Sequence, residues 1–287
     1  SVLGQTYNAL ELIVVDDGST DSSSQVLTGL QAKDDRLKVI LQDNRGPGAA
    51  RNAGLREARG DFIAFLDADD TWSPDCLMSL LAGLEAAPDA VLAYCGWQNI
   101  GLAPQYCKPY IPPDYERGGK LEFFIQHCPW PIHAALVRRA ALTAVGGFDE
   151  QWATSMDFDL WLRIGARQRI TLVPKVMAFY RHDSARPQIT GNKSSVAMNH
   201  WGVQQKYLKD NPEVIVELGR ETIRKLTDGE LMHRGFDAYW KRDLTTARAI
   251  FRLVMRNGYG RLNDWVYMLP SILPEYWHQG LIRWLER

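Results

Sequence analysis

The sequence predicts an α/β fold in which a mostly parallel sheet carries helices on its faces. Three observations predict this class. Short β-branched runs alternate with helical patterns through the first half of the chain, and several of these runs end in a turn that carries acids or glycine. After Arg181 the strand-like runs stop and amphipathic helical patterns replace them. We therefore expect an α/β domain over residues 1–190 and a helical extension over residues 191–287.

The individual elements follow from apolar periodicity and from the residues that bound each run. The expected strands cover residues 11–15, 37–41, 62–66 and 90–94. The expected helices between and after them cover residues 22–32, 48–59 and 74–86. Ser73 is a suitable cap for the last of these helices, because Pro74 favours the first helical position. The helices expected in the C-terminal part cover residues 196–209, 214–226, 230–241 and 244–256.

Two segments have no simple place in this pattern. Residues 96–120 are rich in Pro, Tyr and Gly and lack periodicity, and loops of this length are usually functional in compact domains. We interpret this segment as an active-site flap or acceptor loop. Residues 271–287 carry apolar side chains at helical spacing. This helix either packs on the domain or binds a membrane surface or a partner through its apolar face.

Composition and charge restrict the class of protein. The 287 residues are 46% hydrophobic, and 33 basic against 34 acidic residues give a net charge of −1, which argues against nucleic acid as a partner. No apolar run approaches the roughly 20 residues that span a bilayer, and the first residues lack a signal-peptide pattern. The four cysteines form no CxxC pair, so we expect reduced thiols. A cytoplasmic protein is the expectation, with peripheral attachment at the inner face of the membrane through the C-terminal helix as the alternative.

An acidic cluster, Asp67-Ala68-Asp69-Asp70, follows the apolar run at residues 62–66. Open α/β sheets bind ligands at the carboxyl ends of their strands, which is where these acids are expected. Carboxylate oxygens are the ligands that Mg²⁺ and Mn²⁺ prefer, and three acids in four residues repel one another unless a cation or hydrogen bonds offset the charge. The alternative is a solvated turn in which Asp70 or Thr71 caps a helix.

A second acidic turn, Asp16-Asp17-Gly18-Ser19, follows the first expected strand. A carboxylate at this place can accept hydrogen bonds from a nucleotide base or ribose, and Gly18 permits the tight turn. The alternative is helix capping by Ser19 or Asp21.

Three further positions have chemistry that fits the same pocket. Arg51 lies one turn inside a helix that opens with a glycine-bearing loop, a geometry suited to phosphate. Asp157 lies in the first turn of an expected helix, whose dipole would keep it ionised as a general base, although an acid there can also serve only to stabilise the helix start. Asp159 has the same ambiguity. His182 follows another apolar run and either contacts a metal or diphosphate or is structural.

These motifs together resemble the family 2 glycosyltransferases of the GT-A type, which have a Rossmann-like sheet, and the resemblance runs from Ser1 to about His182. The motifs that carry it are Gln5-Thr6-Tyr7, Asp16-Asp17-Gly18-Ser19, Gly46 to Gly54 with Arg51-Asn52, Leu66-Asp67-Ala68-Asp69-Asp70, Gly147-Phe148-Asp149-Glu150 and Asp157-Phe158-Asp159-Leu160-Trp161-Leu162-Arg163.

The resemblance implies a role for each candidate residue. Asp17 would contact the nucleotide base, and Asp157 would be the catalytic base of an inverting displacement. Asp67 to Asp70 would be the DxD-type motif, in which Asp69 faces the ribose or the metal. The donor-binding residues would be Asp16, Asp17, Ser19, Arg51, Asp67 and Asp69. The ligands of a Mg²⁺ or Mn²⁺ ion would be Asp69, Asp70 and His182.

The chain departs from the family pattern at three places. Met156 stands where members usually have Glu, the first strand of the family and its turn are absent, and the Gln-x-x-Arg-Trp motif of processive members is missing. The resemblance thus implies a non-processive transferase that moves a sugar from a UDP or dTDP donor to a hydroxyl of a glycan, lipid-linked or protein acceptor, in surface polysaccharide or glycan synthesis. The alternatives are a catalytically impaired nucleotide-sugar-binding or interaction module, and a nucleotidyltransferase.

Overall fold

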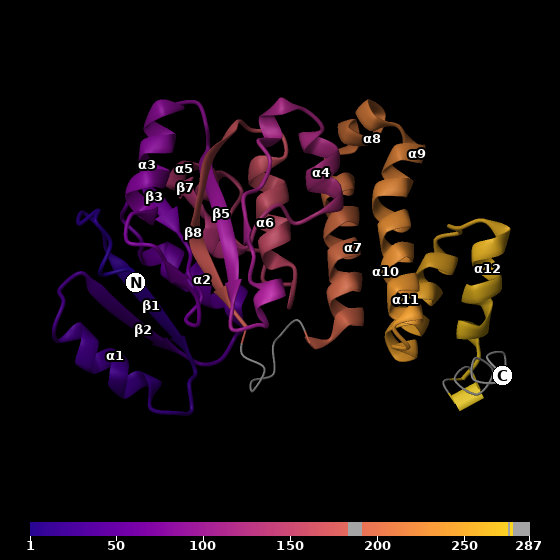
Figure 1. The fold of residues 1–287 in the computed structure, drawn as a ribbon, viewed down its shortest axis with the longest axis horizontal. Coiled ribbons are helices and arrows are strands. Elements are labelled where there is room, and N and C mark those ends of the chain that lie inside the picture. The colour runs from indigo at the N-terminus through magenta and orange to yellow at the C-terminus, as the bar shows by residue number, and fades with distance from the viewer. Residues whose placement is uncertain (183–190, 275, 278–287) are drawn as a thin grey trace. The chain divides into compact units, whose positions relative to one another are not determined.

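The computed structural model describes residues 1–182, 191–274 and 276–277, and the chain divides into two compact units, Ser1–Arg186 and Pro187–Arg287 (Figure 1). The first unit contains every strand among the described residues, and the second unit is helical there. The α/β class with a helical extension is therefore confirmed. The expected boundary after residue 190 falls at the end of a segment outside the described residues.

The first unit begins with a two-stranded parallel sheet of β1 (Leu12–Asp17) and β2 (Leu37–Gln42), joined by α1 (Ser23–Gln31). In Figure 1 these elements lie together at the indigo end of the chain. Helix α2 (Pro47–Glu57) packs on β1, and a Cβ added at Gly54 would be in ordinary van der Waals contact with the side chain of Val15 at 3.5 Å. This sheet positions the turn that follows β1.

The second sheet has six strands, five of them in the order β3-β7-β5-β8-β4, with β6 paired to β5. The strands are β3 (Phe62–Ala64), β4 (Thr71–Trp72), β5 (Leu92–Ile100), β6 (Pro109–Tyr110), β7 (Ala135–Arg138) and β8 (Ile170–Arg181). Strands β5 and β8 are parallel, whereas β3–β7, β5–β7, β4–β8 and β5–β6 are antiparallel.

The sheet is thus mixed, and the expectation of a mostly parallel sheet is wrong for this part of the unit. The difference comes in part from β7, which enters between β3 and β5 in the opposite direction, and in part from β4 and β6, which run antiparallel to β8 and β5. The sequence does not predict this strand, because four residues are too few to show a period.

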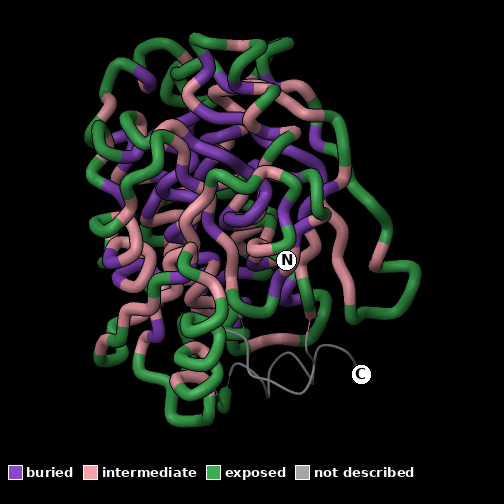
Figure 2. Tube along the Cα trace, turned by 90° about the vertical axis from the view of Figure 1, so that its left-hand side faces the viewer, coloured by how far each residue is buried: buried purple, intermediate pink, exposed green. Residues whose placement is uncertain are grey.

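Helices cover the second sheet and bury its middle strands. Helix α3 (Cys76–Ala86) packs on β5 and β8, and the remaining helices of this unit are α4 (Lys120–Gln126), α5 (Arg139–Ala144) and α6 (Met156–Gly165). Residues 92–95 are fully buried, and buried stretches of this kind are purple in Figure 2. Burial on both faces explains why this part of β5 reads as a continuous apolar run.

The segment over residues 96–120 is more ordered than an irregular loop. Strand β5 continues to Ile100, and the short elements η1 (Pro104–Tyr106), β6 and η2 (Tyr115–Arg117) follow. Another short turn, η3 (Ile132–Ala134), leads directly into β7. The suggested role as a flap or acceptor loop stays a prediction.

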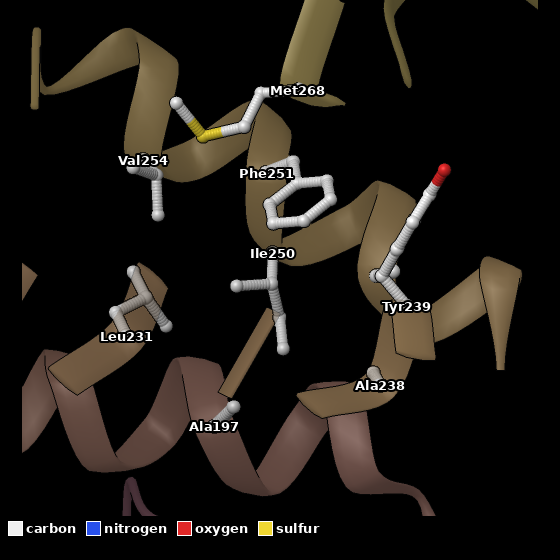
Figure 3. Close-up of a cluster of buried hydrophobic side chains, with 9 residues drawn as sticks. Ala197, Leu231, Ala238, Tyr239, Ile250, Phe251, Val254 and Met268 are labelled. Atoms are coloured by element: carbon white, nitrogen blue, oxygen red, sulfur yellow. The ribbon is translucent and has the colours of Figure 1, made fainter. Parts of the chain in front are cut away.

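The helical unit contains α7 (Lys193–Asp210), α8 (Pro212–Leu218), α9 (Arg220–Arg224), the π-helical turn η5 (Lys225–Gly229), α10 (Glu230–Trp240), α11 (Leu244–Arg256), α12 (Leu262–Met268) and η6 (Leu269–Ile272). The single helix expected over residues 214–226 is divided at Gly219, whose φ is +80°. Figure 3 shows the core of the helical unit, where Ile250 and Phe251 of α11 lie between Ala197 of α7 and Met268 of α12.

Within the described residues, no helix has the length and apolar character needed to cross a membrane. The helix expected over residues 271–287 lies largely outside the described residues, and residues 271 and 272 belong to η6.

Candidate active site

The acidic turn after β3 gives its three carboxylates different surroundings. Asp67 accepts a charge-assisted hydrogen bond from Arg51 of α2, so this acid is paired inside the protein. Asp69 is exposed. The side chain of Asp70 is 1% exposed. The turn therefore presents one free acid, one paired acid and one buried acid.

Protein atoms lie close to both carboxylate oxygens of Asp70, although only Oδ1 accepts a hydrogen bond from the described residues. Oδ1 accepts a hydrogen bond from the backbone N–H of Arg181 at 2.8 Å, and Oδ2 lies 2.9 Å from Nδ1 of His133, which is 0% exposed. A metal ion could reach this carboxylate only after displacing His133 or the strand end. The geometry favours a structural role for Asp70 in place of the predicted contact with a metal.

Asp69 lies in a field of like charge. Partial desolvation raises the pKa of its carboxyl, and the charges of Asp70 and Asp67 raise it further. Within the described part of the chain, no three His, Cys, Asp or Glu residues are grouped so as to hold a metal ion. The predicted trio of Asp69, Asp70 and His182 thus does not form a closed metal site made of protein side chains alone.

Asp157 lies at the start of α6, directly after an unusual backbone conformation. Ser155 has φ of +62°, a left-handed conformation that is costly for a non-glycine residue and often occurs at functional sites. Oδ1 of Asp157 accepts a hydrogen bond from the N–H of Phe158 at 2.8 Å, and Oδ2 lies 3.8 Å from Sγ of Cys128. One oxygen is thus fixed by the backbone, while the other has a weak thiol neighbour.

Burial raises the pKa of the Asp157 carboxyl, and the nearby charge of Asp67 raises it further, whereas the hydrogen bond from Phe158 and the charge of Arg51 lower it. Because the pKa rises on balance, burial outweighs the hydrogen bond from Phe158 and the charge of Arg51. The charges of Arg51 and Asp67 thus both act on Asp157, and α2 approaches the residue before it, since a Cβ on Gly48 would lie 3.9 Å from Sδ of Met156.

Asp159, two residues further on, is held in a structural role. Its carboxylate forms an ion pair with Arg163, which also donates to the backbone oxygens of Val145 and Gly147 at 2.8 Å. Asp159 is 3% exposed. Through Arg163, Asp159 ties α6 to the glycine turn, and this geometry favours the structural alternative for Asp159.

The turn after β1 uses its acids to shape the backbone. Asp16 accepts hydrogen bonds from the N–H of Ser19 at 2.8 Å and the hydroxyl of Ser24 at 2.7 Å, and the hydrogen bonds from these two serines lower the pKa of its carboxyl. Ser19 itself is exposed. Helix α1 has no side-chain cap at Ser22, although Asp21 accepts a hydrogen bond from the N–H of Ser23 at 2.9 Å.

Asp17 holds the loop that leads into α2. Oδ1 accepts from Nε2 of Gln42 at 2.7 Å and from the N–H of Arg45 at 2.9 Å, and Oδ2 accepts from the N–H of Gly46 at 2.8 Å. The predicted contact with a nucleotide base would therefore compete with three protein donors. The structure brings Asp17 together with the glycine loop, and α2 continues from this loop to Arg51.

Asn52 connects α2 to the glycine turn before α6. Its amide nitrogen donates to the backbone oxygen of Phe148 at 2.9 Å, and its amide oxygen accepts from the N–H of Phe148, also at 2.9 Å. A Cβ on Gly147 would lie 2.7 Å from the Asn52 oxygen, and φ of +75° also favours glycine there. The guanidinium of Arg51 lies 5.5 Å from the centre of the Phe148 ring. The Arg51-Asn52 motif of α2 and the Gly147-Phe148 turn, which are distant in the sequence, thus pack against each other.

Tyr180 is a site residue that the sequence does not predict. Burial raises the pKa of its phenol, and the charges of four acids raise it further, namely Asp70, Asp67, Asp69 and Asp157. Tyr180 lies at the acidic turn, because Phe179 pairs with Thr71 and the N–H of Arg181 donates to Asp70. Its ring stacks on His133 at 5.8 Å between centroids and meets the ring of His182 edge-on at 4.7 Å. His182 thus borders the site through Tyr180.

Comparisons with known proteins concern the family and the fold of this chain. The family model described as "Glycosyl transferase family 2" matches residues 1–146. An uncharacterized glycosyltransferase of Rickettsia felis is 31% identical over 181 residues, which are 63% of this chain and 29% of that relative. The chain therefore spans less than a third of the length of this relative.

Two solved structures are similar in fold. The mannosyltransferase PcManGT of Pyrobaculum calidifontis, in complex with GDP-Man and Mn²⁺, has a TM-score of 0.59 at 18% identity and covers 97% of this chain and 76% of that chain. TarS of S. aureus, residues 1–349 in complex with UDP-GlcNAc, has a TM-score of 0.55 at 17% identity and covers 91% of this chain and 87% of that chain. The fold is thus of the GT-A type, and because the family model matches more than half of the 287 residues, the chain belongs to glycosyl transferase family 2.

Proposed function

We propose that this chain carries the catalytic domain of an inverting glycosyltransferase that uses a nucleotide-diphosphate sugar and a divalent cation. The observation that carries the proposal is the position of Asp157. Burial raises the pKa of its carboxyl, the charges of Arg51 and Asp67 act on it, and Asp67 belongs to the same turn as Asp69, while α2 approaches Met156 through Gly48. A base and a candidate cation-binding acid therefore border the same space.

The residues of the acidic turn fit a cation that is shared with a diphosphate. Asp69 is exposed and its pKa is raised by desolvation and by like charges, which a bound cation would offset. Mg²⁺ is commonly bound through one or two carboxylates together with substrate phosphates and water, so a complete protein cage is not required. The cation, when bound, supplies positive charge that stabilises the departing diphosphate. Asp69 is the proposed ligand, and His182 borders the same space.

Asp157 is proposed to act as the general base. Oδ1 is occupied by the N–H of Phe158, so Oδ2 is the oxygen that takes the proton of the acceptor hydroxyl. As that proton moves to Oδ2, the hydroxyl oxygen bonds to the anomeric carbon and the bond from this carbon to the diphosphate oxygen breaks. Attack opposite to the leaving group inverts the anomeric configuration. A raised pKa makes the carboxylate a stronger base than an ordinary aspartate.

The donor class extends beyond the UDP and dTDP sugars expected from the sequence. The two structural relatives were solved with UDP-GlcNAc and with GDP-Man, so donors with either a pyrimidine or a purine base need to be tested. The proposed acceptor is a hydroxyl group on a glycan, lipid-linked or protein substrate.

The test combines binding and turnover. UDP-GlcNAc, UDP-glucose, dTDP-glucose and GDP-mannose are first compared, each with Mn²⁺, for the increase in unfolding temperature they cause. Release of nucleoside diphosphate from the best donor is then measured for the wild type and for Asp157→Asn. We expect release to fall by at least about 100-fold while donor affinity is nearly unchanged. Asp89→Asn, which alters an exposed acid paired with Arg169, is the matched control and should leave both unchanged.

Two outcomes would contradict the proposal. Donor binding without any release by the wild type would support the alternative of a nucleotide-sugar-binding module. An equal loss of binding and release in Asp157→Asn would indicate a folding role for this residue. The pH profile adds a second check: release should decline as pH falls through the raised pKa of Asp157, which lies above the ordinary value of 3.8.

A further inference from the structure

His133 and Asp70 form a polar pair that is sealed inside the first unit. His133 is 0% exposed and the Asp70 side chain is 1% exposed. Nδ1 lies 2.9 Å from Oδ2 without the alignment of a good hydrogen bond, and Nε2 of His133 has no hydrogen-bond partner within the described residues. A buried pair that is only partly satisfied costs stability, and apolar residues of similar volume often replace such pairs without loss. Stability alone therefore does not account for this pair.

The pair connects three segments that are distant in the sequence. Asp70 accepts from the N–H of Arg181, and Nε of Arg181 donates to the backbone oxygen of Asp69 at 3.1 Å, so the acidic turn is fastened to the end of β8. On the other side, the backbone oxygen of His133 accepts from Nε1 of Trp72 at 2.7 Å. The turn, η3 and β8 are thus held together at this pair.

Each partner of the pair touches a different part of the site. Asp70 directly follows Asp69, the proposed cation ligand, and the hydrogen bonds from Arg181 to Asp70 and to the Asp69 backbone oxygen hold the backbone that carries the Asp69 carboxylate. The imidazole of His133 stacks on Tyr180 with an angle of 13° between the rings, and Tyr180 in turn contacts the ring of His182 and precedes Arg181, whose N–H donates to Asp70. A change in the pair would therefore move both the acidic turn and Tyr180.

We infer that Asp70 and His133 are a positioning pair that orients Asp69 and Tyr180 for binding of the cation and the diphosphate. This inference rests on the proposed function and gives Asp70 a role different from direct contact with metal. Partners behind a metal ligand orient it, and their substitution typically lowers metal affinity by about 10- to 100-fold. The same magnitude is expected here.

The experiment measures the affinity for Mn²⁺ in the presence of UDP and, separately, of GDP, by the loss of the free Mn²⁺ signal in electron paramagnetic resonance. His133→Leu removes both nitrogens at similar volume, and we expect binding to weaken by at least about 10-fold. His133→Asn keeps an amide nitrogen near the position of Nδ1, whereas His133→Gln places it near Nε2. Affinity should be restored in His133→Asn to a greater extent than in His133→Gln, which a merely space-filling role would not produce.

A double-mutant cycle tests whether the two residues act together. Asp70→Asn and His133→Leu should each weaken Mn²⁺ binding, and the double variant should be no weaker than the single variants. His200→Leu, which changes a buried histidine of the helical unit, is the matched control and should leave binding unchanged. If His133→Leu does not fold, the comparison of the Asn and Gln variants still decides.

The outcomes separate this inference from the proposed function. If the wild type fails to bind Mn²⁺ in the presence of UDP and also in the presence of GDP, both the proposed function and the positioning pair are overturned. If the wild type binds Mn²⁺ and His133→Leu binds it with unchanged affinity, only the positioning pair is overturned. Equal affinities of the Asn and Gln variants, or fully additive losses in the double variant, would overturn it as well.

Discussion

The acidic turn after β1 and the acidic turn after β3 both follow an apolar strand, yet their carboxylates have different partners. In the first turn, Asp16 and Asp17 accept hydrogen bonds from neighbouring backbone and side-chain donors, and those from Ser19 and Ser24 lower the pKa of Asp16. In the second turn, Asp69 is exposed and its pKa is raised. The carboxylates of the first turn have hydrogen-bond donors within the protein, whereas the charge of Asp69 in the second turn is not offset in this way.

The comparison shows that an acid-rich turn is not by itself a site. The acids of the first turn build the backbone that carries the loop to α2, and through α2 they position Arg51. The second turn contributes Asp69, whose unfavourable electrostatics a ligand can relieve. Perturbed acids of this kind are common at functional sites, whereas acids with lowered pKa are common in structural networks. Substitutions in the two turns should therefore have opposite effects on stability and on binding.

The largest difference is expected for Asp69→Asn. Loss of the free carboxylate should weaken Mn²⁺-dependent nucleotide binding by about 100-fold, near the upper end for removing a cation ligand or its support. The unfolding temperature should stay the same or rise, because a repelled charge is removed. Isothermal titration with UDP or GDP and Mn²⁺, together with thermal unfolding, measures both effects. Unchanged binding would show that the two turns do not differ in the way proposed.

The next largest effect is expected for Asp17→Ala, and here stability should change. The substitution removes the acceptor of three hydrogen bonds and leaves the N–H groups of Arg45 and Gly46 without this partner. We expect a loss of about 2 kcal/mol in the free energy of unfolding, measured by urea denaturation. Asp17→Asn keeps one oxygen acceptor and should lose less. If Asp17→Ala retains full stability but loses nucleotide binding, the first turn is a binding site after all.

The fold could be predicted for many of the runs that were long enough to show a period, although the 12-residue strand β8 was not among the expected strands. Strand β2 begins at Leu37 as expected, and α3 ends at Ala86 as expected. Strand β7 was not predicted because four residues show no period. The division between α8 and α9 was not predicted either, because it depends on the left-handed backbone of Gly219. Short elements and local breaks are set by tertiary packing, which a single sequence does not display.

The candidate site could be predicted in its residue types but not in all of its roles. The strand-then-acid pattern located both turns, and the helix start located Asp157. The pattern could not separate Asp69 from Asp70, because the partner of Asp70 is His133, a residue from a distant segment that precedes an unpredicted strand. Tyr180 was not predicted as a site residue because it comes near the acidic turn only when β4 pairs with β8.

A smaller effect is expected from the glycines beside the first turn. A Cβ on Gly18, where φ is +79°, would lie 2.9 Å from the backbone nitrogen of Asn44, whereas a Cβ on Gly46, where φ is +87°, would meet nothing within 4 Å. Gly46→Ala should cost about 1 kcal/mol from backbone strain alone, and Gly18→Ala should cost more because the Asn44 segment must also shift. Chemical denaturation of the two variants measures the difference. Equal losses would mean that the turn has room to relax.

The smallest effects are expected in the dependence of stability on pH, and their signs are opposite in the two turns. The pKa of Asp16 is lowered from 3.8, so its contribution to stability is present above the unfolded value and is lost as pH falls through the folded value. The pKa of Asp69 is raised from 3.8, so its contribution is present below the unfolded value and is lost as pH rises through the folded value. Between about pH 3 and pH 6, the unfolding temperature of Asp16→Asn should therefore fall progressively below that of the wild type as pH rises, while that of Asp69→Asn should rise relative to the wild type. Thermal unfolding of the three proteins across this range tests the comparison directly, and parallel curves would contradict it because equal slopes mean that neither carboxyl changes its proton affinity on folding.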